Sequence, residues 1–456
     1  MAAADEIALS AEERQRLRPP AAVVRIARTL ADAGFETWCV GGAVRDALLG
    51  IPHLDWDLAT AATPAEVRRL FRRTVPLGIE FGTVGVLDDE GRMHEVTTFR
   101  RDVRTDGRHA EVEFGASLEQ DLARRDFTIN AIAYHPQRRV LRDPFDGRGD
   151  LARGVVRAVG VADERMREDR LRALRAIRFA ARFEFEIEPA TWSAIVDSAP
   201  HMRRLSAERV KQELDKTFEQ VRRAGGALRR WRDAGALAVL VPALAAVGDE
   251  TLAALDRLPR AVGPRAAGRR VVRYATLFAD VPERELAGAL AALRFSKSEA
   301  RAVRHLVALW QGTGEEIERA LRAGAAHGAT LRRWVARAGR TTTGDLLRLA
   351  AARWAARCAA GAPAPPAAEV RALYRRALRV AYGGSPLALG DLAIGGDDLR
   401  AIGVRPGPAM ARLLHRLLDT VLDDPSLNRV DALLALARRL AAEGDDDRHR
   451  GPTGGA

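Results

Sequence analysis

Hydrophobic and polar residues change their spacing part-way along the chain. Up to about residue 160, stretches of helical spacing alternate with short runs rich in β-branched residues. Residues 20–34 have helical spacing and end at a glycine, and 36–40 follow as a strand. The next predicted strand is 54–60, and 82–99 predict a hairpin around the sequence DDEG. From about residue 163 to 440 the spacing is helical throughout.

Local signals mark where several helices begin. Thr63, Pro64 and Glu66 form the pattern of a capping box with proline at the first helical position. Ser206 is the expected N-cap of the helix SAERVKQELDKTF. The Pro-rich stretch AAGAPAPPAAE, residues 359–369, is either a linker or a long interhelical loop.

The pattern as a whole predicts an α+β head followed by a long all-α arm. We expect the head to hold a small mixed β-sheet with flanking helices, and the arm to form a neck, body and tail. The expected segments are a flexible N-terminus (1–20), a head (21–160), a helical neck and body (161–240), a helical body and tail (241–442) and a disordered end (443–456).

Composition narrows the class of partner. The 456 residues carry a formal charge of +12, and the basic side chains are nearly all Arg. This charge favours a polyanionic partner, and nucleic acid is favoured over a membrane. The alternative is that a GC-rich genome encodes Arg in place of Lys. The two cysteines, Cys39 and Cys358, are too far apart in sequence to suggest a disulfide framework or a zinc cluster.

No segment of the sequence predicts export or membrane insertion. The first 20 residues contain acidic side chains and no apolar core of signal-peptide length. Nowhere does an apolar run approach the roughly 18 residues of a membrane span. The expected location is therefore the cytoplasm.

Paired carboxylates stand in the second predicted strand. Asp55 and Asp57 would share one strand face, with Trp56 pointing into the core. Two like charges so close repel unless a cation or a proton neutralises one, and Mg²⁺ with phosphate ligands suits the pair. Glu95, in the second arm of the hairpin, would complete the cluster if its strand lies beside the first. The alternatives are a solvated surface pair and an exposed or salt-bridged Glu95.

A glycine pair follows the first predicted strand. Gly41 and Gly42 let backbone N–H groups approach a phosphate at a helix N-terminus, and Arg45 adds a positive charge. An ordinary turn explains the glycines equally well. No G-x-x-x-x-G-K-[ST] loop occurs in the sequence, so phosphate chemistry of the P-loop kind is excluded.

These motifs, taken in order, closely resemble one family. They run VGGAVRDALLG, LDWDLAT, HEVTTFRRD, DLARRDFTINAIAY, DPFDGRGDL, EDRLRALRAIRFAARF and SAERVKQEL. The set, spanning about residues 36 to 220, is similar to the bacterial class II tRNA nucleotidyltransferases, the CCA-adding enzymes, and to the related bacterial poly(A) polymerases. Residues from GDLAIGG to VLDD resemble the tail of the same family more weakly.

The resemblance implies a role for each motif. Asp55 and Asp57 occupy the positions of catalytic, Mg²⁺-binding aspartates, and Glu95 lies in the strand of the third acid. Gly41, Gly42 and Arg45 match the motif that contacts the incoming triphosphate. The ribose-binding motif is matched by Arg124, Arg125, Asp126 and Asn130, which would otherwise belong to a basic surface link.

Base selection is implied for EDRLR. Asp169 and Arg172, three apart on a predicted helix, would share one face. An acceptor beside a donor complements the amine and ring nitrogen of cytosine and adenine, and opposes the carbonyl and N–H of guanine and uracil. Arg175 continues that face, and the role of Glu168 is open. Without the resemblance, Asp169 and Arg172 would be a surface ion pair.

The implied function is untemplated addition of CCA to the 3′ end of tRNA. CTP and ATP would be the substrates, Mg²⁺ the cofactor, and the basic arm would hold the tRNA by its phosphates. The loop RTDGRHAEVEF is present, as expected of enzymes that complete the final A. The alternatives are an A-adding enzyme or poly(A) polymerase of the same family, and an RNA-binding protein that has lost catalysis.

Overall fold

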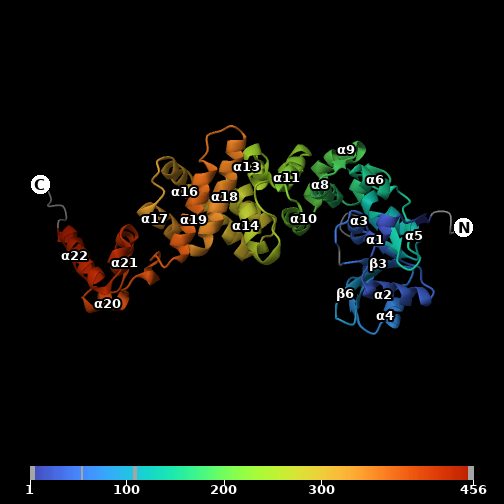
Figure 1. Ribbon diagram of the computed structural model, residues 1–456, viewed down its shortest axis with the longest axis horizontal. Helices are drawn as coiled ribbons and strands as arrows, with labels where there is room; N and C mark the ends of the chain where they lie inside the picture. The colour runs from blue at the N-terminus through green and yellow to red at the C-terminus, as the bar shows by residue number, and fades with distance from the viewer. Residues whose placement is uncertain (1–5, 53–54, 106–109, 450–456) are drawn as a thin grey trace. The chain divides into compact units, whose positions relative to one another are not determined.

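The computed structural model describes residues 6–52, 55–105 and 110–449, and the chain divides into two compact units. One unit ends at Ala245 and the other begins at Ala246, close to the boundary expected between residues 240 and 241. The division expected at residue 160 falls inside the first unit, so the sheet and the neck helices fold together. All strands in the described residues belong to this first unit (Figure 1).

An eight-stranded mixed sheet underlies the first unit. Its strand order is β1-β10-β9-β2-β3-β6-β5-β4. Only β3 and β6 pair in parallel, and every other neighbouring pair is antiparallel, which confirms the expected mixed sheet. The strands are β1 Ile7–Ala8, β2 Thr37–Val40, β3 Asp57–Thr60, β4 Thr74–Pro76, β5 Thr83–Leu87, β6 Met93–Thr98, β9 Ala133–His135 and β10 Val140–Arg142. Two small ribbons pair β7 Arg100–Thr105 with β8 Ala110–Phe114, and β11 Val155–Val156 with β12 Glu186–Ile187.

The centre of the sheet is buried because its strands carry apolar residues on both faces. Every residue of β2 is buried, and Trp38 and Val40, which share one face, pack with Phe99 and with two leucines of α5. Trp56 is only 2% exposed and lies against Tyr134, with 6.5 Å between ring centroids, as expected for a core residue. The hairpin expected over 82–99 is confirmed as β5 and β6.

Helices of the first unit flank the sheet and continue into the neck (Figure 1). They are α1 Ala11–Arg16, α2 Ala21–Asp32, α3 Gly42–Leu48, α4 Pro64–Leu70, α5 Leu118–Ala123, α6 Gly147–Arg153, α7 Ala162–Glu168, α8 Leu171–Phe183, α9 Pro189–Ser198, α10 Ala207–Gln220, α11 Ala224–Asp233 and α12 Ala236–Leu240, with a short 3₁₀ turn, η2, at Thr128–Asn130. The capping box of α4 is confirmed, with the Thr63 side chain accepting from the Glu66 N–H. Ser206 is the N-cap residue of α10, without a side-chain capping hydrogen bond in the described structure.

The second unit is built from helices alone within the described residues. They are α13 Asp249–Leu255, α14 Ala266–Leu277, α15 Glu283–Ala292, α16 Lys297–Arg322, α17 Gly328–Ala338, α18 Arg340–Ala359, α19 Ala367–Tyr382, α20 Gly396–Ala401, α21 Pro408–Asp423 and α22 Val430–His449. The Pro-rich stretch joins α18 to α19, which pack on each other, so it is an interhelical loop. Among the helices the structure describes, none is long and apolar enough to cross a membrane.

Both ends of the chain differ from expectation. Residues 1–20 were expected to be flexible, yet β1 pairs with β10, and α1 has a capping box formed by Ser10 and Glu13. Glu13 also binds Arg148 at 2.7 Å, which ties α1 to α6. Residues 443–456 were expected to be disordered, yet the backbone of α22 continues to His449. The remaining residues, 1–5 and 450–456, lie outside the described residues.

Candidate active site

The glycine pair forms the turn between β2 and α3. Gly41 has φ +75° and ψ −135°, a conformation that only glycine adopts readily. A Cβ atom on Gly41 would lie 2.9 Å from a guanidinium nitrogen of Arg125. The turn thus brings the start of α3 directly against the motif expected to bind ribose.

The acidic pair stands at the start of β3 rather than within it. The strand begins at Asp57, so Asp55 and Trp56 precede it, although the buried Trp56 still alternates with the two more exposed aspartates. Asp55 is exposed, whereas Asp57 is partly buried. The parallel register of β3 and β6 pairs Leu58 with Val96, which brings Asp57 beside Glu95.

Asp55, Asp57 and Glu95 are close enough for their charges to affect the pKa of Asp57. Burial, the charge of Glu95 and the charge of Asp55, in that order of size, raise the pKa of Asp57 to about 7, against the opposing charge of Arg125. The crowding of these acids therefore disfavours the charged form of Asp57 when no cation is present. A cation in front of it would favour the carboxylate form.

A divalent cation fits this donor set only if the substrate completes it. In the described parts of the chain, no three or more His, Cys, Asp and Glu side chains form a metal-ligand group. The expected three-carboxylate cluster is thus not arranged as a complete ligand set. Asp55 and Asp57 suit Mg²⁺, which commonly takes one or two carboxylates and fills its octahedron with water and substrate phosphates.

A pocket of about 330 Å³ opens beside Asp57 and brings together residues from four motifs. Eight of the residues expected for the site line it. They are Gly41, Gly42, Arg45, Asp57, Arg125, Asp126, Asn130 and Arg175. Residues from the glycine turn, β3, η2 and α8, up to 134 positions apart in sequence, thus share one cavity.

Arg45 is a buried part of the pocket wall. Its guanidinium is 3% exposed, donates to Asp46 at 2.7 Å and to Asn130 at 2.5 Å, and lies 4.9 Å from the centroids of Phe179 and Phe183. Burial lowers its pKa, and Asp46 counteracts this. Arg45 therefore joins α3, η2 and α8, and presents little charge to a ligand directly.

Asp126 organises the floor of the pocket. It accepts two hydrogen bonds from Arg175, at 2.8 and 2.7 Å, and one from the Asn130 amide at 2.8 Å. Burial alone would raise the pKa of Asp126, but Arg175 and Asn130 outweigh it and the pKa is lowered. Asp126 is thus a fixed carboxylate that orients an arginine and an amide toward the cavity.

Arg124 and Arg125 are adjacent in sequence, but their side chains lie in different places. Both bind Asp121 of α5, at 2.9 and 3.1 Å. Only Arg125 lines the pocket, where it lies against Gly41. Arg124 lies outside the pocket, and its carbonyl accepts from Arg172 at 3.1 Å.

Asp169 and Arg172 do not stand on one continuous helix, so that expectation is wrong. α7 ends at Glu168, Asp169 is extended with φ −148°, and α8 begins two residues later. The Asp169 carboxylate binds Arg209 at 2.6 Å, and Arg172 binds Glu168 at 2.5 Å. Neither lines the pocket, although Asp169 raises the pKa of Arg175 from nearby.

Several pocket residues were missed by sequence reasoning. They are Arg178, Phe179, Arg182, Lys216 and Gln220. Arg178, Phe179 and Arg182 stand three, four and seven positions after Arg175 on α8, so they share its face, and this spacing could have indicated them. Lys216 and Gln220 come from α10, and nothing in the sequence shows that α10 packs beside α8.

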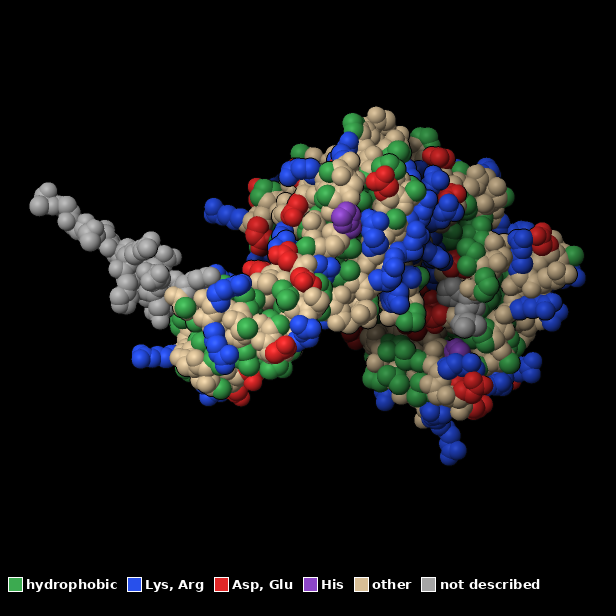
Figure 2. Space-filling view, turned by 60° about the vertical axis from the view of Figure 1, so that its left-hand side comes forward, with side chains coloured by type: hydrophobic (Ala, Val, Ile, Leu, Met, Phe, Trp, Pro, Cys, Tyr) green, Lys and Arg blue, Asp and Glu red, His purple; other side chains and the backbone are tan. Residues whose placement is uncertain are grey.

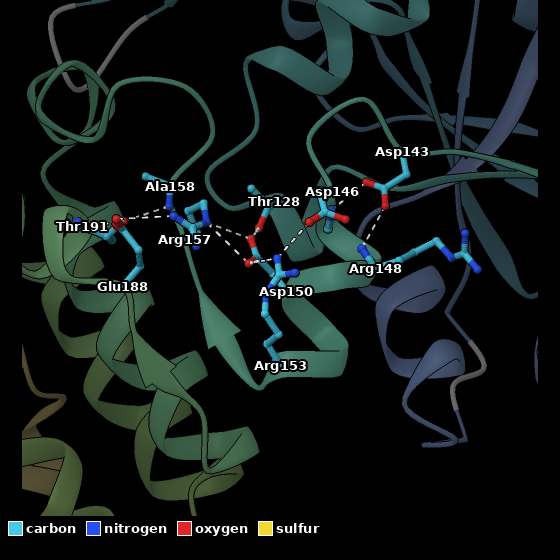
Figure 3. Close-up of polar contacts among 11 residues, drawn as sticks. Thr128, Asp143, Asp146, Arg148, Asp150, Arg153, Arg157, Ala158, Glu188 and Thr191 are labelled. Carbon is cyan, nitrogen blue, oxygen red and sulfur yellow. Dashed lines mark hydrogen bonds and ion pairs between the residues drawn. The ribbon is translucent and has the colours of Figure 1, made fainter. Parts of the chain in front are cut away.

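A buried network holds η2 in place (Figure 3). Asp150 of α6 is 1% exposed and accepts from the Thr128 hydroxyl at 2.7 Å and from Arg157 at 3.1 Å. A Cβ atom on Gly147 would lie 2.2 Å from the Thr128 carbonyl oxygen, so glycine allows α6 to approach η2 this closely. The network thereby fixes Asn130, which η2 carries into the pocket.

Two family descriptions match the first unit. "Poly A polymerase head domain" matches residues 37–157, and "Probable RNA and SrmB- binding site of polymerase A" matches residues 184–247. The first covers the sheet with the glycine turn, the acidic residues and η2. The second covers α9 to α12, including α10.

Similar proteins extend the match over nearly the whole chain. A CCA-adding enzyme of Lacticaseibacillus paracasei is 34% identical over 92% of this chain and 97% of its own, and one of Lactiplantibacillus plantarum is 35% identical over 91% and 95%. The crystal structure of a Bacillus stearothermophilus CCA-adding enzyme in complex with CTP superposes with a TM-score of 0.74, at 28% identity, over 93% of this chain and 98% of that one. A Thermotoga maritima CCA-adding enzyme complexed with tRNA shares the fold, with a TM-score of 0.68 at 21% identity.

Proposed function

The chain belongs to the CCA-adding enzymes, the class II tRNA nucleotidyltransferases, and we propose that it adds C, C and A to the 3′ end of tRNA from CTP and ATP. The observation that carries the proposal is the pocket beside Asp57. Six cationic side chains and two carboxylates line it, a composition suited to a nucleoside triphosphate. The site draws on the same motifs whose order resembles this family.

The reaction joins the tRNA 3′ oxygen to the α-phosphorus of the nucleotide. The bond between that phosphorus and the bridging oxygen breaks, pyrophosphate leaves with the electron pair, and the hydroxyl proton passes to solvent. Mg²⁺, the cofactor we propose, would lower the hydroxyl pKa and neutralise charge on pyrophosphate. Asp55 and Asp57 would hold it, and Glu95 would add negative charge behind them.

The remaining motifs position the nucleotide. Arg125 and Asn130 both line the pocket and would hydrogen-bond the ribose hydroxyls, with Asp126 fixing the amide of Asn130. To select a base, Asp169 would release Arg209, and Arg172 would release Glu168. Base selection would therefore require both side chains to exchange their present ion-pair partners for the base.

The tRNA would be held mainly by its phosphates. The chain carries 73 Lys and Arg against 61 Asp and Glu, and Figure 2 shows Lys and Arg side chains gathered into a patch on the visible face. Phosphate contacts release counterions, so tRNA affinity should fall steeply as salt rises. We expect the protein to work in the cytoplasm, where its tRNA substrate is.

Sizing the products on tRNA that lacks CCA tests the proposal. With CTP, ATP and Mg²⁺, the purified protein should add three nucleotides and stop, and should add two with CTP alone. A long A tail would instead assign it as a poly(A) polymerase. Inaction unless the tRNA already ends in CC would assign it as an A-adding enzyme, and binding without any addition would indicate lost catalysis.

A further inference from the structure

Helix α10 supplies one wall of the pocket. Lys216 and Gln220 stand one turn apart on this helix and both line the cavity. The glycine turn, more than 170 residues earlier in the sequence, lines the same cavity. Neither was expected from the motifs. Of the six cationic side chains that line the pocket, Lys216 is the only one from α10 and the only lysine.

The arginines of the pocket are held by carboxylates. Arg178 donates to Glu213 at 2.7 Å and to Gln220 at 2.9 Å, with its side chain 4% exposed. Arg182 donates to the buried Asp46 at 2.8 Å. These contacts fix each guanidinium and use part of its hydrogen-bonding capacity.

Lys216 differs in its contacts and its exposure. Its nearest acidic partner among the described residues is Glu213, at 3.6 Å, beyond hydrogen-bond distance, and Glu213 already binds Arg178. The Lys216 side chain is 43% exposed, against 1% for Glu213. Its ammonium can therefore turn toward a ligand in the pocket without breaking a short ion pair.

Lysine is also unusual in this chain. Of the 73 basic residues only three are Lys, and two of these, Lys211 and Lys216, stand on α10. Lysine offers a compact charge on a flexible stem, which can follow a phosphate group that moves. Arginine offers a planar fork that suits a fixed partner, as seen for Arg178.

We propose that Lys216 binds the phosphates of the incoming nucleotide that leave as pyrophosphate. The inference rests on the proposed function and adds a residue to the nucleotide site. The guanidiniums of the pocket are fixed by Asp46, Asp121, Asp126 and Glu213, whereas Lys216 is free to move with the leaving group. Its charge would favour both triphosphate binding and departure of the phosphates.

Binding of CTP and CMP to matched variants tests the assignment. Lys216→Met removes the charge and keeps the length of the stem, and Lys216→Arg restores the charge. Lys211→Met is the control, since Lys211 stands on the same helix, binds Asp215 at 2.8 Å and does not line the pocket. Lys216→Met should weaken CTP binding about tenfold and leave CMP binding within about twofold.

The same variants are then compared in the addition assay. Lys216→Met should raise the KM for both CTP and ATP and leave the KM for tRNA unchanged, Lys216→Arg should recover most of the loss, and Lys211→Met should match the unmodified protein. Equal CTP affinity in Lys216→Met would overturn the assignment, as would an effect on the KM for tRNA alone, which would place Lys216 on the primer. If Lys216→Met does not fold, Lys216→Gln replaces it in the same measurements.

Failure of the proposed function gives a different result. An unmodified protein that adds no nucleotide to tRNA overturns the function itself. An unmodified protein that adds CCA while Lys216→Met and Lys216→Gln bind CTP normally overturns only the role of Lys216.

Discussion

Two cavities of similar size, one in each unit, differ in their balance of charge. The pocket of the first unit, about 330 Å³, is lined by six cationic side chains and two carboxylates. A cavity of about 390 Å³ in the second unit is lined by Arg353 and Arg357 against Asp280, Glu315 and Glu318. The two cavities are therefore distinguished by the charge of their lining side chains and not by their volume.

The two cavities also place the partners of their arginines differently. In the second unit, Arg353 binds Asp280 at 2.9 Å and Arg357 binds Glu318 at 2.5 Å, all four residues lining the same cavity. In the first unit, Asp126 holds Arg175 from within the pocket, but Asp46, Asp121 and Glu213, which hold the other arginines, do not line it. Carboxylates behind the wall orient the cations and leave positive charge facing a ligand, which suits a polyanionic substrate.

The largest effect is expected from removing a carboxylate in each cavity. Asp57→Asn should lower the rate of nucleotide addition about 10³-fold or more, because it removes a charge that we propose holds the cation. Asp280→Asn, the matched change in the second unit, should leave the rate within about twofold. Single-turnover extension of labelled tRNA measures both rates. A Asp57→Asn protein with more than a tenth of normal activity would contradict the assigned site.

Base selection should be the next most sensitive property. Asp169→Ala removes the acceptor that we propose favours cytosine and adenine, so incorporation of UTP and GTP relative to CTP should rise about 10- to 100-fold. Asp163→Ala, which removes an exposed acid from the start of α7, serves as the control. Competition between nucleotides on tRNA lacking CCA gives the ratio. If selectivity is the same in both variants, Asp169 does not read the base.

The sequence predicted the chemistry of the site better than its geometry. Gly41, Asp57, Asp126 and Arg175 were expected from motifs and do share one pocket. Local signals suggested Gly41 and Asp57, which sit at a turn and a strand end, whereas Asp126 and Arg175 were identified only through the family resemblance. The family resemblance supplied the order that joins them.

The expectations that failed depend on details that periodicity does not encode. The helix through EDRLR was expected to be continuous, but Asp169 adopts an extended backbone conformation. Residues 6–20 were expected to be flexible, yet β1 pairs with a strand distant in sequence, and Leu9 and Leu17 are buried. Lys216 was missed because the packing of α10 beside α8 is a tertiary contact between segments far apart in sequence.

A smaller effect is expected from the backbone of the glycine turn. Gly41→Ala would force a side chain into a φ of +75° and against Arg125, costing on the order of 1–3 kcal/mol of stability and raising the KM for CTP. Gly288→Ala is the control in the second unit, where no atom lies within 4 Å of the added Cβ and the helix should gain about 0.5–1 kcal/mol. Urea unfolding and CTP titration measure both. Unchanged stability in Gly41→Ala would show that the turn is not constrained as described.

The smallest effect concerns the sheet under acid. His135 of β9 is 9% exposed and lies edge-on to Trp38, and burial, followed by the charge of Arg138, lowers its pKa from 6.5 to about 4. Between these values the unfolded chain binds a proton that the folded chain does not, so stability falls as pH drops from 6.5 toward 4.

Replacing His135 by Phe should remove that part of the pH dependence. The free energy of unfolding of His135→Phe, minus that of the unmodified protein, should rise by roughly 1–2 kcal/mol between pH 7 and pH 4.5. This holds whatever the difference between the two proteins is at pH 7. His305→Phe in α16 of the second unit is the control, because His305 is exposed. Urea unfolding of each full-length variant at both pH values gives the difference. If the unfolding free energies of His135→Phe and the unmodified protein change equally with pH, the sheet tolerates a charged His135. His135 would then not make the first unit more sensitive to acid than the second.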